Sequence, residues 1–104
     1  MTDTFDVLNP ATEDVVKTVH MASSDEVDSA VARAKAAWPA WRDSAPHHKA
    51  TVLRRFASLV EAHTAELAAL EVLEAGHTIG NAEWEVSNVV NVFNYFAEIG
   101  RAHV

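Results

Sequence analysis

The histidines and carboxylates are the side chains of this sequence most suited to chemistry, because metal binding and proton transfer both rely on them. His47 and His48 are neighbours, so on a helix they point about 100° apart and cannot share one ion. None of His20, His63 and His77 has a second histidine or a glutamate at the spacing of a helical metal motif. The pattern therefore favours solvated or helix-cap histidines over a histidine metal site.

Two pairs of glutamates lie close together in the sequence, but only the presence of two carboxylates in each pair suggests acid–base catalysis. Glu71 and Glu74 lie one helical turn apart, and Glu83 and Glu85 flank a tryptophan. Acid–base catalysis needs two environments that separate the two pKa values, whereas both pairs fall in the polar stripe of an amphipathic pattern. Solvated helix faces explain these residues better than a carboxylate-only hydrolase, which requires a cleft and a second well-placed acid.

Composition excludes several other kinds of site. The chain has no cysteine, which removes a thiolate nucleophile, and its three glycines form neither of the two common phosphate-binding motifs. Eight lysines and arginines against fifteen acidic residues give a net charge of −7, which disfavours nucleic acid. An apolar run of about 20 residues and a basic signal region are both missing. We expect a cytoplasmic protein that binds neither nucleic acid nor membranes.

The 104 residues suffice for one small domain, and their patterning predicts an α+β fold. Apolar alternation on both sides of the Asn9–Pro10 turn is typical of a β-hairpin. The alternation in the second strand places Val15, Val19 and Met21 on one face. A lone hairpin is only marginally stable in water, so these strands need a further surface to pack against.

Amphipathic helices are expected after the hairpin. Ser23 and Glu26 form a capping-box pattern at the start of the first helix, and Pro39 is expected to end or kink it. Its apolar stripe consists of Val27, Ala30, Val31, Ala34 and Trp38. Pro46 fits the first turn of a second helix. The apolar face of that helix comprises Val52, Leu53, Phe56, Leu59 and Val60.

Two further helices complete the prediction. His63 and Thr64 interrupt the second helix, Thr64 is expected to cap a third, and Gly76 suits the position just beyond its end. A last helix is expected to open near Asn81. It carries Val86, Val89, Val90, Phe93 and Ala97 at helical spacing. The predicted fold is thus an N-terminal β-hairpin followed by three to four amphipathic helices.

Six segments, in this order, are similar to the opening of the aldehyde dehydrogenase superfamily. They are residues 7–13, 25–34 together with 38–41, 53–57, 66–71, 74–76 and 92–97. The resemblance therefore runs over residues 5–97, and it implies that residues 1–97 are the N-terminal part of the cofactor-binding domain. The chain would then be a fragment of an α/β, Rossmann-like NAD(P)-binding domain.

The resemblance implies oxidation of an aldehyde to a carboxylic acid with NAD or NADP, through a cysteine thiohemiacetal. The family's cysteine, its glutamate, its asparagine and its glycine-rich loop have no counterpart in this sequence. The chain alone is therefore expected to be inactive and to bind no cofactor. The full-length enzyme is expected to bind an aldehyde and to form a homo-oligomer. The alternative is a small stand-alone helical interaction module, which would be a monodisperse and cooperatively melting species.

The resemblance also implies two sites. Backbone carbonyls at Val7 and Leu8, with the Glu74 carboxylate, correspond to a monovalent cation site, although the family usually has aspartate at the third position. Asn88 corresponds to a position that lines the aldehyde tunnel, where an amide would suit a polar aldehyde. The alternative for Glu74 is a solvated glutamate near a helix end, and the alternative for Asn88 is a surface asparagine.

The last seven residues depart from the family pattern. Residues 98–104 read Glu-Ile-Gly-Arg-Ala-His-Val. A common sequencing adapter encodes this heptapeptide in frame as GAG ATC GGA AGA GCA CAC GTC, and its next codon is a stop. We therefore expect residues 98–104 to be a non-native, adapter-derived tail. Other codons for this stretch in the coding DNA would contradict the interpretation.

Overall fold

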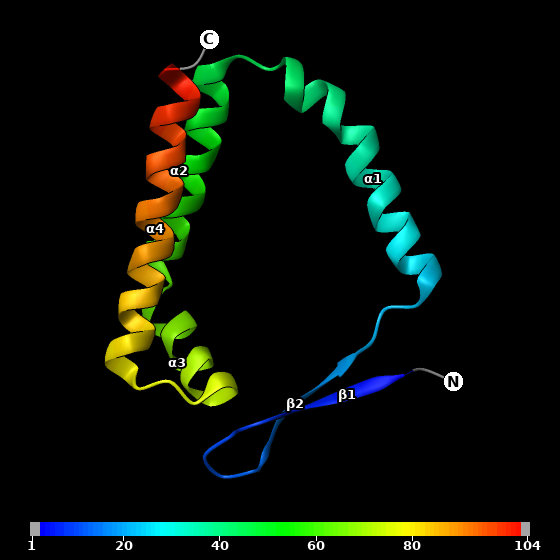
Figure 1. The fold of residues 1–104 in the computed structure, drawn as a ribbon, viewed down its shortest axis with the longest axis vertical. Coiled ribbons are helices and arrows are strands. Elements are labelled where there is room, and N and C mark those ends of the chain that lie inside the picture. The colour runs from blue at the N-terminus through cyan, green and yellow to red at the C-terminus, as the bar shows by residue number, and fades with distance from the viewer. Residues whose placement is uncertain (1–2, 103–104) are drawn as a thin grey trace.

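The computed structural model describes residues 3–102, which form a β-hairpin followed by four helices (Figure 1). Strand β1 covers Thr4–Leu8 and pairs antiparallel with β2, Val15–His20. The pairing is irregular between Val7 and Leu8, which lie opposite Lys17 and Val15. One residue of β2 is therefore left over in a bulge, which interrupts the alternation of the strand.

This bulge corrects the predicted face of the second strand. Val15 is exposed, whereas Val16 and Val19 are half-buried. Met21 is exposed as well, so the three predicted residues do not share a covered face. Sequence alternation assumes an uninterrupted pleat, and one extra residue shifts everything beyond it to the other side.

The predicted Asn9–Pro10 turn is confirmed. The Asn9 side-chain oxygen accepts a hydrogen bond from the Ala11 N–H at 2.9 Å, and the Asn9 N–H donates to the Asp14 carbonyl at 2.8 Å. Glu13 takes a positive φ of 65°, which closes the loop before β2. Such local bonds from asparagine to the backbone are characteristic of turns.

Helix α1, Ser24–Asp43, begins with the predicted capping box. The Glu26 N–H donates to the Ser23 hydroxyl oxygen at 3.2 Å, and the Ser23 N–H donates to the Glu26 carboxylate at 2.7 Å. Pro39 lies inside the helix and does not end it. Proline removes one N–H donor, yet the last turn still forms, and the Ser44 hydroxyl closes it by donating to the Trp41 carbonyl at 2.7 Å.

Three helices follow: α2, Pro46–Ala62; α3, Thr64–Ala75; and α4, Ile79–Ala102. The expectation that Thr64 caps α3 is wrong, because His63 occupies that position and the Thr64 hydroxyl donates to the carbonyl of Glu61 at 2.7 Å. Gly76 ends α3 as predicted, with a left-handed φ of 73°. Among the helices of the described residues, none combines the length and apolar character needed to cross a membrane.

Helix α4 begins two residues before the predicted Asn81. The Thr78 hydroxyl accepts a hydrogen bond from the Asn81 N–H, and the Thr78 carbonyl accepts one from Ala82. At its other end α4 continues over residues 98–102, where Glu98 forms an ion pair with Arg54 of α2. The adapter origin of these residues stays a prediction, and residues 103 and 104 lie outside the described part of the chain.

The core lies between α2, α3 and α4. Helices α2 and α4 run side by side in opposite directions, and α3 packs against the start of α4 (Figure 1). The buried hydrophobic residues of the described chain are Ala50, Ala57, Ala68, Ala82, Val86 and Ala97. All but one are alanines, whose small side chains let helices approach closely. Phe56 and Phe93 add a tilted ring contact with centroids 4.5 Å apart.

Helix α1 lies away from this core, on the far side of an open arch (Figure 1). It contains no buried residue, and Val27, Val31 and Trp38 of its predicted apolar stripe are half or more exposed. The radius of gyration is 17.8 Å, against about 13 Å for a compact domain of this length. The accessible surface is 8000 Å², against roughly 5,700 Å² for a compact monomer of this mass. The chain thus leaves a large apolar surface uncovered.

Candidate functional site

The end of β1 and the end of α3 meet at Gly76. A Cβ on Gly76 would lie 2.8 Å from the Pro10 Cγ, so the proline ring fills the space that glycine leaves open. The positive φ of Gly76 independently favours glycine at this position. The contact brings the segment of Val7 and Leu8 next to the helix end that carries Glu74.

The predicted cation ligands are therefore on neighbouring segments. Val7 is half-buried, whereas Leu8 and Glu74 are exposed. Two carbonyl oxygens and a carboxylate are hard oxygen donors, which suit an alkali cation. The donor types fit the ion, and coordination by these three residues stays a prediction.

Asn88 lies on the exposed side of α4. The residues one and two turns away on the same side are Trp84, Val92 and Tyr95, which are 67%, 43% and 61% exposed. The opposite side of the helix carries the buried Val86. Asn88 is thus a polar residue within an uncovered apolar strip, and its place in an aldehyde tunnel stays a prediction.

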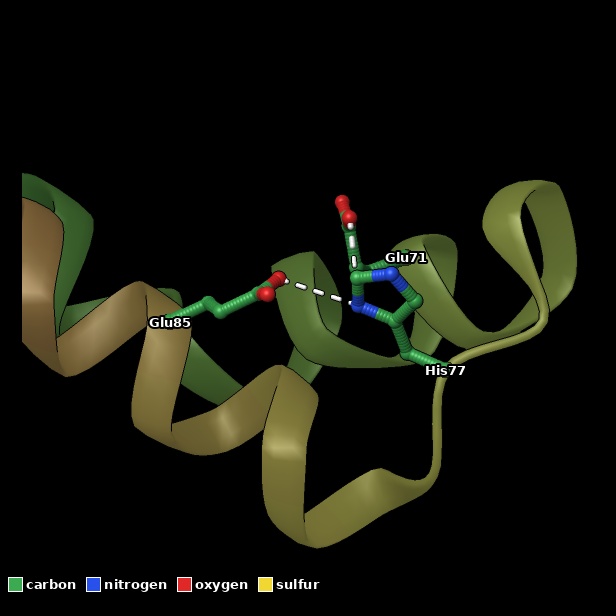
Figure 2. Close-up of side chains that lie close together, drawn as sticks. All are labelled: Glu71, His77 and Glu85. Carbon is green, nitrogen blue, oxygen red and sulfur yellow. Dashed lines mark hydrogen bonds and ion pairs between the residues drawn. The ribbon is translucent and has the colours of Figure 1, made fainter.

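The structure also brings together three titratable side chains that the sequence did not connect. The Nδ1 atom of His77 lies 3.0 Å from a carboxylate oxygen of Glu85 and 3.6 Å from one of Glu71 (Figure 2). Their candidate ligand atoms all lie within 4.8 Å of one another, and all three residues are half-buried. Glu71 belongs to α3, His77 to the loop after it and Glu85 to α4. We call these three residues the His77 cluster.

The His77 cluster was missed because its members are six and eight residues from the histidine, which is no periodicity of a single helix. The available signal was Gly76, which predicts that the chain turns back after α3. That turn lays the first turns of α4 against α3, so side chains from both helices converge on the loop. Spacing within one element therefore could not reveal the cluster.

An open groove of about 330 Å³ lies beside the cluster and is lined by residues of α2, α3 and α4. Its lining is mainly apolar and comprises Val60, Leu67, Leu70, Glu71, Glu74, Val86 and Val89. Glu71 and Glu74, the predicted solvated pair, thus border it from α3. The lining holds no hydroxyl, thiol or amine, and its polar groups are the carboxylates of Glu71 and Glu74, so the groove is suited mainly to binding apolar groups.

The shifted pKa values of the described chain lie at the two ends of α1. The pKa of Glu26 is lowered, mainly because the Ser23 N–H donates to its carboxylate and secondly because His20 bonds to it. The pKa of Asp43 is lowered, and that of Arg42 raised, by their mutual hydrogen bonds. All three side chains are exposed, so these shifts reflect helix-end pairing rather than a buried catalytic site.

The part of the chain that the structure describes contains no glycine-rich pyrophosphate loop. Gly76 caps α3, while Gly80 and Gly100 lie within α4. A pyrophosphate loop needs glycines between a strand and a following helix, and this chain passes from β2 into α1 without one.

Comparison with known proteins gives a consistent picture. The sequence profile described as "Aldehyde dehydrogenase family" matches residues 1–103. The succinate-semialdehyde dehydrogenase [NADP(+)] GabD of Escherichia coli is 35% identical over 99 residues, which are 95% of this chain and 20% of that protein. The chain thus spans about a fifth of the length of its relatives.

Solved structures agree with the sequence matches. Succinate-semialdehyde dehydrogenase from Burkholderia pseudomallei superposes with a TM-score of 0.93 at 32% identity, covering 98% of this chain and 21% of that one. Betaine aldehyde dehydrogenase from Staphylococcus aureus, solved in complex with NAD+, superposes with a TM-score of 0.90 at 27% identity. The match covers 95% of this chain and 21% of that one. The hairpin and four helices therefore match the N-terminal region of these enzymes.

Proposed function

Because the chain belongs to the aldehyde dehydrogenase family, we propose that residues 1–97 form the first part of the cofactor-binding domain of an NAD(P)-dependent enzyme. That enzyme oxidises an aldehyde to a carboxylic acid. The chain by itself is inactive and binds no NAD(P), since it has neither a cysteine to attack the carbonyl nor a glycine-rich loop for the cofactor.

The observation that carries this proposal is the uncovered apolar surface. Helix α1 buries nothing, and α4 exposes a second apolar strip around Asn88. Contiguous exposed apolar patches mark surfaces that pack against another protein surface, a membrane or a ligand. In the relatives the matched region is about a fifth of the chain, so the remaining four-fifths are the natural cover.

The finer assignments belong to that full-length enzyme. The carbonyls of Val7 and Leu8 and the Glu74 carboxylate hold a monovalent cation, which the contact between Pro10 and Gly76 supports by joining the two segments. Asn88 faces the aldehyde tunnel, which its place in an uncovered strip supports. We further propose a cytoplasmic homo-oligomer that binds no nucleic acid.

A chimera tests the proposal. Residues 1–97 of this chain replace the matching N-terminal segment of the Escherichia coli enzyme, and NADP+-dependent oxidation of succinate semialdehyde is measured. A matched chimera carries the same segment from the Burkholderia pseudomallei enzyme. We expect both chimeras to be soluble and active, because the backbone of the segment superposes closely on that of the family. Loss of activity in the first chimera alone would contradict the proposal.

The 104-residue chain alone supplies the second measurement. We expect no reduction of NAD+ or NADP+ with any aldehyde, and a broad thermal transition rather than a sharp one, because α1 has nothing to pack against. A monodisperse species that melts in one cooperative step, including α1, would instead favour the stand-alone interaction module.

A further inference from the structure

We propose that the His77 cluster is a binding site for a divalent transition metal of the Zn²⁺ class. The ligand atoms are the His77 Nδ1 and one carboxylate oxygen each from Glu71 and Glu85. The site is separate from the proposed monovalent cation site, which uses backbone carbonyls at the end of β1. Metal binding at this site requires no dehydrogenase activity, so its test is independent of the test of the proposed function.

The distances within the cluster match those between ligands that share one ion. Zinc binds imidazole nitrogen and carboxylate oxygen at about 2.0–2.2 Å, so two neighbouring ligands of a tetrahedral ion lie about 3.3–3.5 Å apart. The two contacts of the His77 Nδ1, at 3.0 Å and 3.6 Å, bracket that value. The two carboxylates lie within 4.8 Å of each other, so a small rotation of either glutamate completes the triangle.

The charge of the cluster calls for a cation. Two carboxylates converge on one imidazole, and Glu74 lines the same groove as Glu71. Among the ion pairs of residues 3–100, those of Glu71 and Glu85 are with His77 and not with a lysine or an arginine. Converging carboxylates repel each other at half-buried positions unless a positive charge lies between them. A metal ion bound between them supplies that charge.

The scaffold holds the three ligands from separate elements. Glu71 and Glu85 each lie one turn beyond a fully buried alanine, Ala68 in α3 and Ala82 in α4. These two alanines are part of the packed contact between the helices, so the spacing of the two carboxylates follows from the core. The short loop after Gly76 then places His77 between them. Such positioning by packed helices favours metal binding over loose surface chelation.

The donor set selects the class of ion. One imidazole and two carboxylates suit zinc and its first-row neighbours, whereas calcium takes six to eight oxygen ligands, which these residues do not supply. Three protein ligands leave at least one position for water. We therefore use Zn²⁺ as the probe.

Calorimetric titration of Zn²⁺ into the metal-free 104-residue chain at neutral pH tests the proposal. We expect one ion per chain, and an affinity at least about tenfold lower in each of Glu71→Gln, His77→Gln and Glu85→Gln. Two control variants should leave the affinity unchanged. His20→Gln removes a histidine that contacts only one carboxylate, Glu26 at 3.2 Å, and Glu83→Gln removes an exposed acid two residues from Glu85.

A second measurement uses the unmutated chain, so it does not depend on how the variants fold. Nitrogen NMR of the histidine rings follows each Nδ1 and Nε2 during addition of Zn²⁺. The proposal expects the Nδ1 of His77 to shift first and to saturate at one equivalent. Binding that is absent, that is spread over several histidines, or that starts at His47 and His48 would overturn it.

Discussion

The molecule contains two regions of amphipathic helix, and these regions differ in what their apolar residues contact. The unit of α2, α3 and α4 buries six hydrophobic residues, whereas α1 buries none. Helices in both regions show amphipathic periodicity. This periodicity predicts which face of a helix is apolar, but it does not predict which surface will pack against that face. The helices of that unit bury their apolar faces against one another, whereas α1 has no such packing partner among the described residues.

The largest difference between the two regions should come from a charge placed on an alanine. Ala57→Asp puts a carboxylate between α2 and α4, where the side chain is 1% exposed, and should destabilise the helical unit by about 3–5 kcal/mol. The matched change Ala36→Asp lies on α1, where every residue is exposed, and should alter stability by less than about 1 kcal/mol. Urea denaturation followed by circular dichroism measures both. Equal losses would show that α1 is packed in solution.

Substitutions at Gly76 and Gly80 test whether the contact between the hairpin and α3 contributes to stability. Gly76→Ala should destabilise the contact of the hairpin with α3 by about 1–2 kcal/mol, because alanine disfavours the positive φ and its Cβ meets Pro10. Gly80→Ala is the control, since a Cβ there meets nothing within 4 Å and alanine favours a helix, so α4 should lose no stability and gain at most about 0.5–1 kcal/mol in its first turn.

Hydrogen exchange of β1 and α3 separates these two outcomes. In Gly76→Ala the exchange of β1 should accelerate, and adding Pro10→Ala should restore part of the protection, because it removes the Cγ atom that the new Cβ meets. If Pro10→Ala restores nothing, the φ strain alone accounts for the loss.

The capping box offers a smaller effect that is confined to α1. Ser23→Ala removes the acceptor of the Glu26 N–H and should reduce the stability of α1 by about 1 kcal/mol, with α2 to α4 unchanged. Ser29→Ala lies within the same helix, where its hydroxyl accepts only an exposed bond from Arg33, and should leave α1 as stable or slightly more so. Residue-resolved hydrogen exchange distinguishes the two variants. A loss that spreads to α4 would mean that α1 and the helical unit fold together.

Lowering the pH should produce the smallest difference in stability between α1 and the helical unit, and the loss should occur in α1. The folded-state pKa of Glu26 lies below its ordinary value of 4.5, so its contribution is fully present above pH 4.5 and is lost as pH falls through the folded-state pKa. The first turn of α1 should therefore fray below pH 4.5 before the alanine-packed helices respond. Amide exchange of the first turn against pH measures this. In Glu26→Gln the same region should lose its dependence on acid.

Most of the secondary structure was predictable because its signals are local. The capping box at Ser23, the proline start of α2 and the left-handed end of α3 at Gly76 each depend on a few consecutive residues. The errors occurred where local rules compete. Thr64 bonds back to Glu61 instead of capping α3, and one extra residue in β2 moves Val15 out of the predicted face.

The sequence by itself determined the elements, their order and the family, since periodicity, caps and motif order need no contact between distant residues. Only the tertiary structure decided which apolar faces are covered, because that depends on how α4 returns along α2 and leaves α1 alone. The same return joins Glu71, His77 and Glu85 across two helices and a loop. Their proximity is a product of the turn at Gly76 and of alanine packing, and no spacing along the chain encodes it.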